Sequence, residues 1–130
     1  MPSHKSHTIL IIDDEDTIGK MLVRCLKREG FEALAATNSK EGLSVLRRKK
    51  VDVVLLDIKL EDEDGFEVFK LIKKDFPTLP VVMLTGLGYD DQAMKKALDV
   101  GVSGYLSKTA DISEIGTAVR RILVSDEQKS

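Results

Sequence analysis

The sequence predicts a single α/β domain in which five parallel strands alternate with five helices, with helices on both faces of one sheet. Three observations support this fold class. Five short apolar runs recur along the 130 residues, and a segment with helical spacing of apolar residues follows each run. The connections between them are short, and strict alternation of this kind is typical of a parallel sheet. The length suits one domain with a proper hydrophobic core.

The apolar runs define the expected strands. The first, third and fourth are nearly continuous Val, Ile and Leu, as expected of parallel strands covered on both faces, whereas the second and fifth are weaker and suit less central positions. Right-handed crossovers leave few topologies, and five units of this length suit a doubly wound (βα)5 sheet with the flavodoxin-like strand order 2-1-3-4-5. The expected strands are Thr8–Ile12, Phe31–Ala36, Asp52–Leu56, Val81–Leu84 and Val102–Leu106.

The helices are expected from apolar residues at helical spacing between these runs. Gly30 stops the first helix, Pro77 ends the third and Gly101 closes the fourth, while Asp111 is a candidate N-cap of the fifth. The apolar stripes are, in chain order, Ile18, Met21, Leu22, Cys25 and Leu26; Leu43 and Leu46; Phe66, Phe69, Ile72 and Phe76; Ala93, Met94, Ala97 and Leu98; and Ile112, Ile115, Val119 and Ile122.

Composition narrows the class of protein. A net charge of −2 argues against a general binder of nucleic acid or of anionic membranes. The single cysteine, Cys25, excludes an internal disulfide and fits a reducing compartment, and its place on an apolar stripe favours core packing over redox sensing. No apolar run approaches the roughly 18 residues of a membrane span, so we expect a cytoplasmic protein with no membrane contact. The basic run at residues 47–50 suits a helix C-terminus.

Three segments are expected along the chain. Residues 1–7 form a flexible N-terminal segment, residues 8–125 form the domain, and residues 126–130 form a polar tail or the stump of a linker. We expect no DNA-binding segment after residue 125, so the chain as given fits either a stand-alone domain or a domain excised from a longer protein.

Carboxylates gather where two of the strands end. The run "ILIIDDEDTIG" places Asp13, Asp14, Glu15 and Asp16 directly after the first strand, and the third strand, "VDVVLLD", ends in Asp57. In an open α/β sheet the functional crevice lies at the carboxyl ends of the strands, at the switch point between strands 1 and 3, so these groups are expected to meet. Repelling carboxylates indicate a compensating hard cation, with Mg²⁺ favoured.

The remaining two strands end at the same crevice. The fourth strand runs into "VVMLTGLG" and places the hydroxyl of Thr85 there, while the fifth runs into "GYLSKT" and places the ammonium group of Lys108 there. Each residue alone also fits a turn or a surface charge. Together with the carboxylates they supply a metal site, a nucleophile, a hydroxyl donor and a fixed cation, which is the set that phosphoryl transfer needs.

These motifs, in this order, resemble the CheY-like receiver domain of two-component response regulators over about residues 7 to 125. The matching segments are Asp13–Asp14, Asp57 followed by "IKLEDEDGFE", Thr85–Gly86, and "GYLSK" ending in Lys108. The resemblance implies a signalling phosphoacceptor rather than an enzyme in the usual sense. It would accept a phosphoryl group from a sensor histidine kinase or a histidine phosphotransfer protein, and would later dephosphorylate itself.

The resemblance also implies roles at the metal site. Asp57 would be the phosphoacceptor, a carboxylate nucleophile that forms an aspartyl phosphate. Asp14 would bind Mg²⁺ (or Mn²⁺) directly and Asp13 mainly through water. Asp57 and the backbone carbonyl of Lys59 would complete the protein's ligands.

Further roles implied by the resemblance concern the phosphoryl group and the output. Thr85 would hydrogen-bond the phosphoryl oxygens, Lys108 would pair with them, and Gly86 would keep the entrance open. Thr85 would move toward the new charge of about −1.5 to −2, and Tyr105 would rotate inward. The reshaped face would be that of the fourth helix, fifth strand and fifth helix, where a partner or a second copy would bind. The alternative for Tyr105 is a half-buried ring with its hydroxyl in water.

Several positions depart from the usual family pattern. Glu61 stands where the family usually has proline, so the acidic loop is expected to lose rigidity. Lys108 is followed by Thr109, where the family mostly has proline after a cis peptide bond; a cis bond without proline costs about 2.5–4 kcal/mol. Lys59 and Leu87 occupy positions that tune the lifetime of the phosphoryl group in the family.

Three other functions compete with this interpretation. A haloacid-dehalogenase-like phosphotransferase needs an aspartate two residues after its nucleophile, where Lys59 stands here. A flavin- or nucleotide-binding module needs a loop of backbone amides after the first strand, and the acidic run would repel phosphate there. A receiver that works without phosphorylation, as an interaction surface, stays open because of the departure at Thr109.

Overall fold

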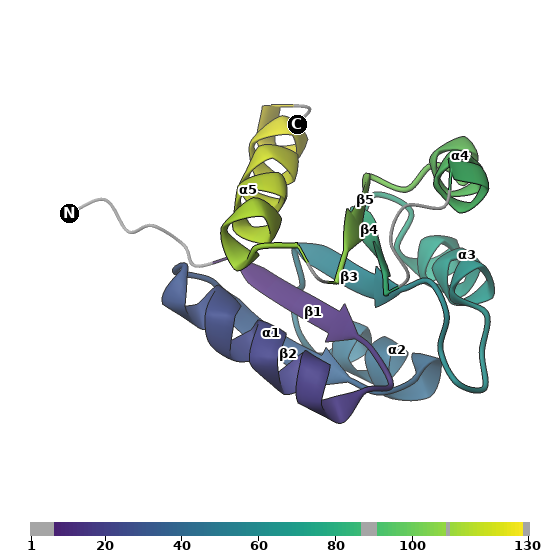
Figure 1. Cartoon of the computed structure of the whole chain (residues 1–130), viewed down its shortest axis with the longest axis horizontal. Helices are drawn as coiled ribbons and strands as arrows, with labels where there is room; N and C mark the ends of the chain where they lie inside the picture. The colour runs from purple at the N-terminus through teal and green to yellow at the C-terminus, as the bar shows by residue number, and fades with distance from the viewer. Residues whose placement is uncertain (1–6, 87–90, 109, 129–130) are drawn as a thin grey trace.

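The structure, a computed structural model, describes residues 7–86, 91–108 and 110–128, without the side chains of residues 112 and 126–128. Over these residues it confirms the predicted fold, a five-stranded parallel sheet in the order β2-β1-β3-β4-β5 with helices in between (Figure 1). The strands are β1 (Thr8–Ile12), β2 (Glu32–Ala36), β3 (Val53–Asp57), β4 (Val81–Thr85) and β5 (Gly104–Ser107). The helices are α1 (Asp16–Arg28), α2 (Ser39–Arg48), α3 (Gly65–Asp75), α4 (Asp91–Val100) and α5 (Ile112–Gln128).

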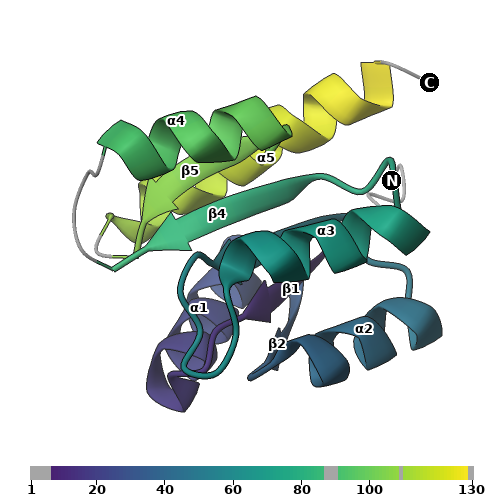
Figure 2. The ribbon, with the colours of Figure 1, turned by 90° about the vertical axis from the view of Figure 1, so that its right-hand side faces the viewer.

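The two faces of the sheet are covered by different helices, because successive strand residues point to opposite sides. In Figure 2, α2, α3 and α4 lie on the side of the sheet toward the viewer, with α1 and α5 behind it. The face under α1 and α5 buries Ile9, Ile11, Leu22, Leu26, Val53, Leu55, Val82, Leu84, Ile115, Val119 and Leu123. The face under the other helices buries Leu10, Ile12, Val45, Leu46, Val54, Leu56, Val68, Phe69, Ile72, Met83 and Ala97.

The observed strand ends differ from the predicted ones where polar residues join the sheet. β1 has the predicted bounds, but β3 and β4 extend onto Asp57 and Thr85, which pair in register with Leu84 and Ser107. β5 begins only at Gly104, because the apolar Val102 lies in the turn after α4 and bonds back to it. Pairing within the sheet therefore fixes the backbones of Asp57 and Thr85 at the carboxyl ends of β3 and β4.

Two predicted stripe residues are exposed. Met21 is 47% exposed and Leu98 is 53% exposed, because each lies on the flank of its helix, beyond the line that faces the sheet. Cys25, predicted to pack in the core, is half-buried. Leu123, outside the predicted stripe of α5, is buried instead of its half-buried neighbour Ile122.

The predicted helix ends are confirmed in detail. Gly30 and Gly101 have φ of 96° and 97°, the left-handed conformation that favours glycine after a helix. The Ser113 N–H donates to Asp111 Oδ1 at 3.2 Å, as expected of an N-cap. α5 continues to Gln128, past the boundary expected at residue 125, while the division into segments stays a prediction. Among the described helices, none combines the length and the apolar character that crossing a bilayer requires.

Candidate functional site

The predicted site residues come together at the carboxyl end of the sheet. Asp13 follows β1, Asp57 and Thr85 end β3 and β4, and Lys108 follows β5. All four are almost fully buried, with 1% to 8% of their surface exposed. Because each directly continues a buried strand, the sheet itself sets where their side chains begin.

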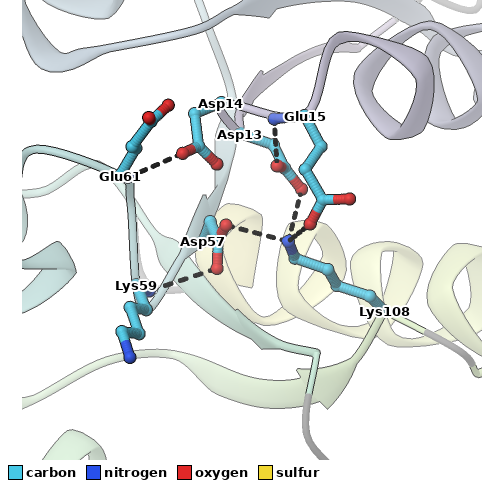
Figure 3. A network of polar contacts seen from close by, with 7 residues as sticks. All are labelled: Asp13, Asp14, Glu15, Asp57, Lys59, Glu61 and Lys108. Atoms are coloured by element: carbon cyan, nitrogen blue, oxygen red, sulfur yellow. Dashed lines mark hydrogen bonds and ion pairs between the residues drawn. The ribbon is translucent and has the colours of Figure 1, made fainter.

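Lys108 lies at the centre of the acidic residues (Figure 3). Its Nζ donates a hydrogen bond to Asp57 Oδ2 at 2.8 Å and lies 3.3 Å from Glu15 Oε1. Asp13 Oδ2 is 3.0 Å from the same nitrogen, an ion-pair distance, but its direction does not suit a hydrogen bond. One ammonium group thus serves three carboxylates, two of them buried.

Burial and pairing act in opposite directions on this cluster. Burial raises the pKa of the Asp57 carboxyl above its ordinary value, against the hydrogen bonds from Lys108 and from the Lys59 amide that lower it. Burial also lowers the pKa of the Lys108 ammonium group. Pairing with Asp57 and Asp13 raises this pKa by more than burial lowers it, so the net shift is upward. Lys108 therefore keeps its charge at neutral pH, and the site offers Asp57 only partial compensation for its burial.

The acidic residues fit a divalent cation. Single carboxylate oxygens of Asp13, Asp14 and Asp57 lie within 4.8 Å of one another, and Asp13 Oδ2 is a buried acceptor without a hydrogen bond to the described residues. The Lys59 carbonyl accepts no hydrogen bond from the described part of the chain, while the Lys59 N–H holds Asp57 Oδ1 at 3.1 Å. These hard oxygen donors are the kind that Mg²⁺ and Mn²⁺ prefer.

A cavity of about 770 Å³ opens beside Asp57. Thr85, Gly86 and Lys108 line it on the side of β4 and β5, and the acidic loop after β3 lines the other side. The side chain of Lys59 points away from the carboxylates in Figure 3, so this lysine does not add to the positive charge beside Asp57. The cavity gives an incoming group access to the Asp57 carboxylate.

The environment of Tyr105 contradicts one of the two alternatives predicted for this residue. Tyr105 is only 8% exposed and packs in the core under α3 and α4. Its hydroxyl is buried and makes no hydrogen bond with the described residues, so the half-buried ring with a hydroxyl in water is wrong. Tyr105 lines the same cavity as Thr85. The predictions for Leu87 and for the Lys108–Thr109 peptide concern residues outside those described.

The acidic loop after β3, residues 58–64, is better anchored than its lack of proline suggests. The Leu60 N–H donates to the Glu63 carbonyl at 3.1 Å, and the Glu61 N–H donates to Asp14 Oδ2 at 2.6 Å. Asp64 caps α3 by accepting a hydrogen bond from the Phe66 N–H at 2.9 Å. These hydrogen bonds anchor the loop at three points, while its loss of rigidity relative to a loop with proline stays a prediction.

The end of this loop requires glycine, and we expect Gly65→Ala to be strongly destabilising. A Cβ at Gly65 would lie 2.5 Å from the carbonyl oxygens of both Asp57 and Ile58. The backbone must move to admit it, so the free energy of unfolding should fall by about 1–3 kcal/mol. Urea denaturation measures this. Gly86→Ala is the matched control, since among the described residues its Cβ would meet only Lys108 Cδ, at 3.7 Å; equal losses in the two variants would contradict the prediction.

Sequence reasoning missed three contacts in and around the site. Glu15 was recognised only as part of the acidic run, yet it pairs with Lys108, a residue 93 positions away. The Glu61 amide binds Asp14, and Glu63 binds Ser39 at the start of α2. The acidic composition of both segments was visible in the sequence, but no local pattern indicates which distant group each carboxylate contacts.

Comparison with known proteins now defines the class of protein. An α/β domain with a buried aspartate, two neighbouring aspartates and a lysine at the strand ends is the arrangement of a phosphoacceptor signalling domain. Residues 9–120 match the model of the response regulator receiver domain, and the chain belongs to that family. The acidic triad is typical of the Mg²⁺ site of receiver domains.

Individual relatives agree with this assignment. The chain is 36% identical over 117 residues to the transcriptional regulatory protein GlrR of Escherichia coli, covering 90% of this chain and 26% of GlrR. It is 34% identical over 118 residues to the phosphate regulon regulator PhoB of Pseudomonas aeruginosa, covering 89% of this chain and 51% of PhoB. The chain thus spans about a quarter of GlrR and about half of PhoB.

Solved structures show the same fold. A response regulator receiver domain protein from Clostridium thermocellum superimposes with a TM-score of 0.87 and 31% identity, over 95% of this chain and 99% of that one. NtrX from Brucella abortus superimposes with a TM-score of 0.89 and 28% identity, over 95% of this chain and 28% of NtrX.

Proposed function

We propose that this domain takes a phosphoryl group onto Asp57 from a phosphohistidine of a sensor kinase or of a histidine phosphotransfer protein. The observation that carries the proposal is the setting of Asp57, a buried carboxylate at a cavity wall with Lys108 on one oxygen and the Lys59 N–H on the other. Asp13, Asp14, Asp57 and the Lys59 carbonyl would hold Mg²⁺ or Mn²⁺. The metal supplies positive charge that stabilises the phosphoryl oxygens in the transition state.

The proposed transfer is an in-line displacement at phosphorus. One oxygen of Asp57 forms a bond to phosphorus while the bond to the donor's histidine nitrogen breaks, and the electron pair of that bond leaves with the imidazole. Lys108 pairs with the phosphoryl oxygens, and the Thr85 hydroxyl donates a hydrogen bond to them. Loss of the phosphoryl group later follows attack by water at the same phosphorus.

We also propose how the new charge reaches a partner. Thr85 moves toward the phosphoryl oxygens, and Tyr105, already 8% exposed, rotates further inward into the space that Thr85 leaves. Its buried hydroxyl without a partner among the described residues supports a side chain that can change its contacts. The face of α4, β5 and α5 then changes shape. Leu98, Val100 and Val124 are exposed apolar residues on α4 and α5, which supports a partner or a second copy of the chain binding there.

The setting of the domain is part of the proposal. Named relatives such as GlrR and PhoB are transcriptional regulators, and the chain covers only part of each. We propose a cytoplasmic receiver that controls an output carried by another segment or another chain. The net charge of −2 supports the absence of direct nucleic-acid contact, and the single cysteine supports a reducing compartment.

Acetyl phosphate tests the chemistry without a partner. The purified chain should gain one phosphoryl group, seen by intact mass, in the presence of Mg²⁺ and not in its absence. A phosphorylated histidine phosphotransfer protein should give the same product faster. A folded chain that is modified by neither donor would reject phosphoryl transfer and leave the interaction-only receiver.

A further inference from the structure

One carboxylate anchors the outer side of the acidic loop to another element of the fold. Glu63 Oε1 accepts a hydrogen bond from the Ser39 N–H at 2.8 Å, and Glu63 Oε2 accepts one from the Ser39 hydroxyl. Ser39 is the first residue of α2, directly after the N-cap Asn38. Its N–H is one of the amides that no carbonyl within the helix can reach, and negative charge is favoured at a helix N-terminus. Glu63 therefore ties the loop to α2 across 24 positions of sequence.

The inner side of the same loop faces the acidic site. The Glu61 N–H donates to Asp14 Oδ2 at 2.6 Å, and Lys59 contributes its N–H to Asp57. The hydrogen bond from the Leu60 N–H to the Glu63 carbonyl, 3.1 Å, closes the turn between these two sides. A short closed turn thus connects Glu63 to the backbone groups that contact two of the acidic triad.

We propose that Glu63 is a positioning residue, which through Ser39 holds the loop in place and thereby sets the affinity of the acidic triad for Mg²⁺. The inference rests on the proposed function, because it concerns that same metal site. Glu63 lines the cavity, but its side-chain hydrogen bonds go to Ser39 and not to the triad; it acts through the turn that carries Glu61 and Lys59. Partners of this kind, one step removed from a metal, orient its ligands, and their loss typically weakens binding.

Calorimetric titration of the whole chain with Mg²⁺ tests the proposal. Glu63→Ala should weaken Mg²⁺ binding by about tenfold, while the phosphorylation reached at saturating Mg²⁺ stays at the wild-type level. Asp62→Ala is the matched control. It removes the same charge from the same loop, but the exposed Asp62 side chain makes no contact of this kind with the described residues. The difference in Mg²⁺ affinity between the two variants separates the effect of the Glu63–Ser39 hydrogen bonds from the effect of losing one negative charge.

Variants of Ser39 test the other end of the tie. Ser39→Pro removes both hydrogen-bond donors, and proline suits the first position of a helix, so α2 should persist and Mg²⁺ binding should weaken as in Glu63→Ala. Glu63→Gln keeps an acceptor for the Ser39 N–H and should bind Mg²⁺ more tightly than Glu63→Ala. Amide hydrogen exchange at Glu61, measured without metal, should be faster in Glu63→Ala than in Asp62→Ala.

The outcomes separate this inference from the proposed function. If the wild-type chain gives no Mg²⁺ isotherm, the metal site itself is rejected and the role of Glu63 with it. If the wild type binds Mg²⁺ but Glu63→Ala and Asp62→Ala bind it equally, only the positioning role is overturned. If Glu63→Ala fails to fold by circular dichroism, Ser39→Ala takes its place in the comparison with Asp62→Ala.

Discussion

An Asp57→Asn variant is expected to show no phosphoryl adduct with acetyl phosphate and Mg²⁺ under conditions that modify the wild type completely. The amide is nearly the same shape as the carboxylate and can still accept the hydrogen bond from the Lys59 N–H, which is 3.1 Å long in the wild type. It has no anionic oxygen to attack phosphorus. Intact mass, with the acetyl phosphate and Mg²⁺ concentrations held equal, measures the loss.

The control for this variant is Asp62→Asn, which makes the same change on an exposed carboxylate of the adjacent loop. It should be modified as the wild type is. A phosphoryl adduct on Asp57→Asn, located by peptide mapping to another carboxylate such as Asp13 or Asp14, would contradict the assignment of Asp57 as the acceptor. An adduct on the same other carboxylate in both variants would indicate unspecific modification.

The second large effect is expected from Lys108→Met. The lysine side chain is 5% exposed and neutralises Asp13 and Asp57, whose side chains are 0% and 3% exposed. Methionine keeps the apolar length of the side chain but leaves two buried carboxylates without their cation. Removing one partner of a buried pair costs about 3–5 kcal/mol, so the free energy of unfolding in metal-free buffer should fall by that order. Urea denaturation measures it.

Magnesium should restore part of this stability. The cation binds the same carboxylates in the folded state, and a ligand that binds only the folded state stabilises it by mass action. The gain in unfolding free energy on adding Mg²⁺ should therefore be larger for Lys108→Met than for the wild type. Lys20→Met is the control, because the Lys20–Asp16 pair is exposed on α1 and worth about 0.3–0.5 kcal/mol. A metal-free stability of Lys108→Met equal to that of Lys20→Met would contradict the central role of Lys108.

Much of the fold and of the acidic site could be predicted from the sequence, because both follow from local patterns. Continuous Val, Ile and Leu runs indicate strands buried on both faces, and β1 and the strand order were predicted as observed. In a parallel sheet, any polar residue that directly follows a strand lies on the same edge as its counterparts. Asp13, Asp57 and Lys108 could therefore be expected to meet although they are far apart in the chain.

The details that decide the chemistry depend on the tertiary structure. Which carboxylates share Lys108 depends on the direction of each side chain, so the contact of Glu15 with this lysine had no signal in its own neighbourhood. The acidic loop was predicted to be less rigid because it lacks proline. Its contacts with the N-terminus of α2 at Ser39 and with the carboxylate of Asp14 could not be predicted from the loop's own residues. Whether a residue on the flank of a helix such as α1 is exposed or buried likewise depends on how that helix packs on the sheet.

The sequence by itself determined the α/β fold class, the strand order and the set of groups at one edge of the sheet. Local hydrophobic patterning gives the strands and their polar ends, since each strand buries its own residues and ends at its own polar side chain. The right-handed crossovers then limit the strand order. Only the tertiary structure decided how the charges are paired, that Tyr105 is buried, and that Glu63 ties the loop to α2. Such contacts join positions distant in sequence, and their energies depend on distance, direction and burial, none of which a local pattern contains.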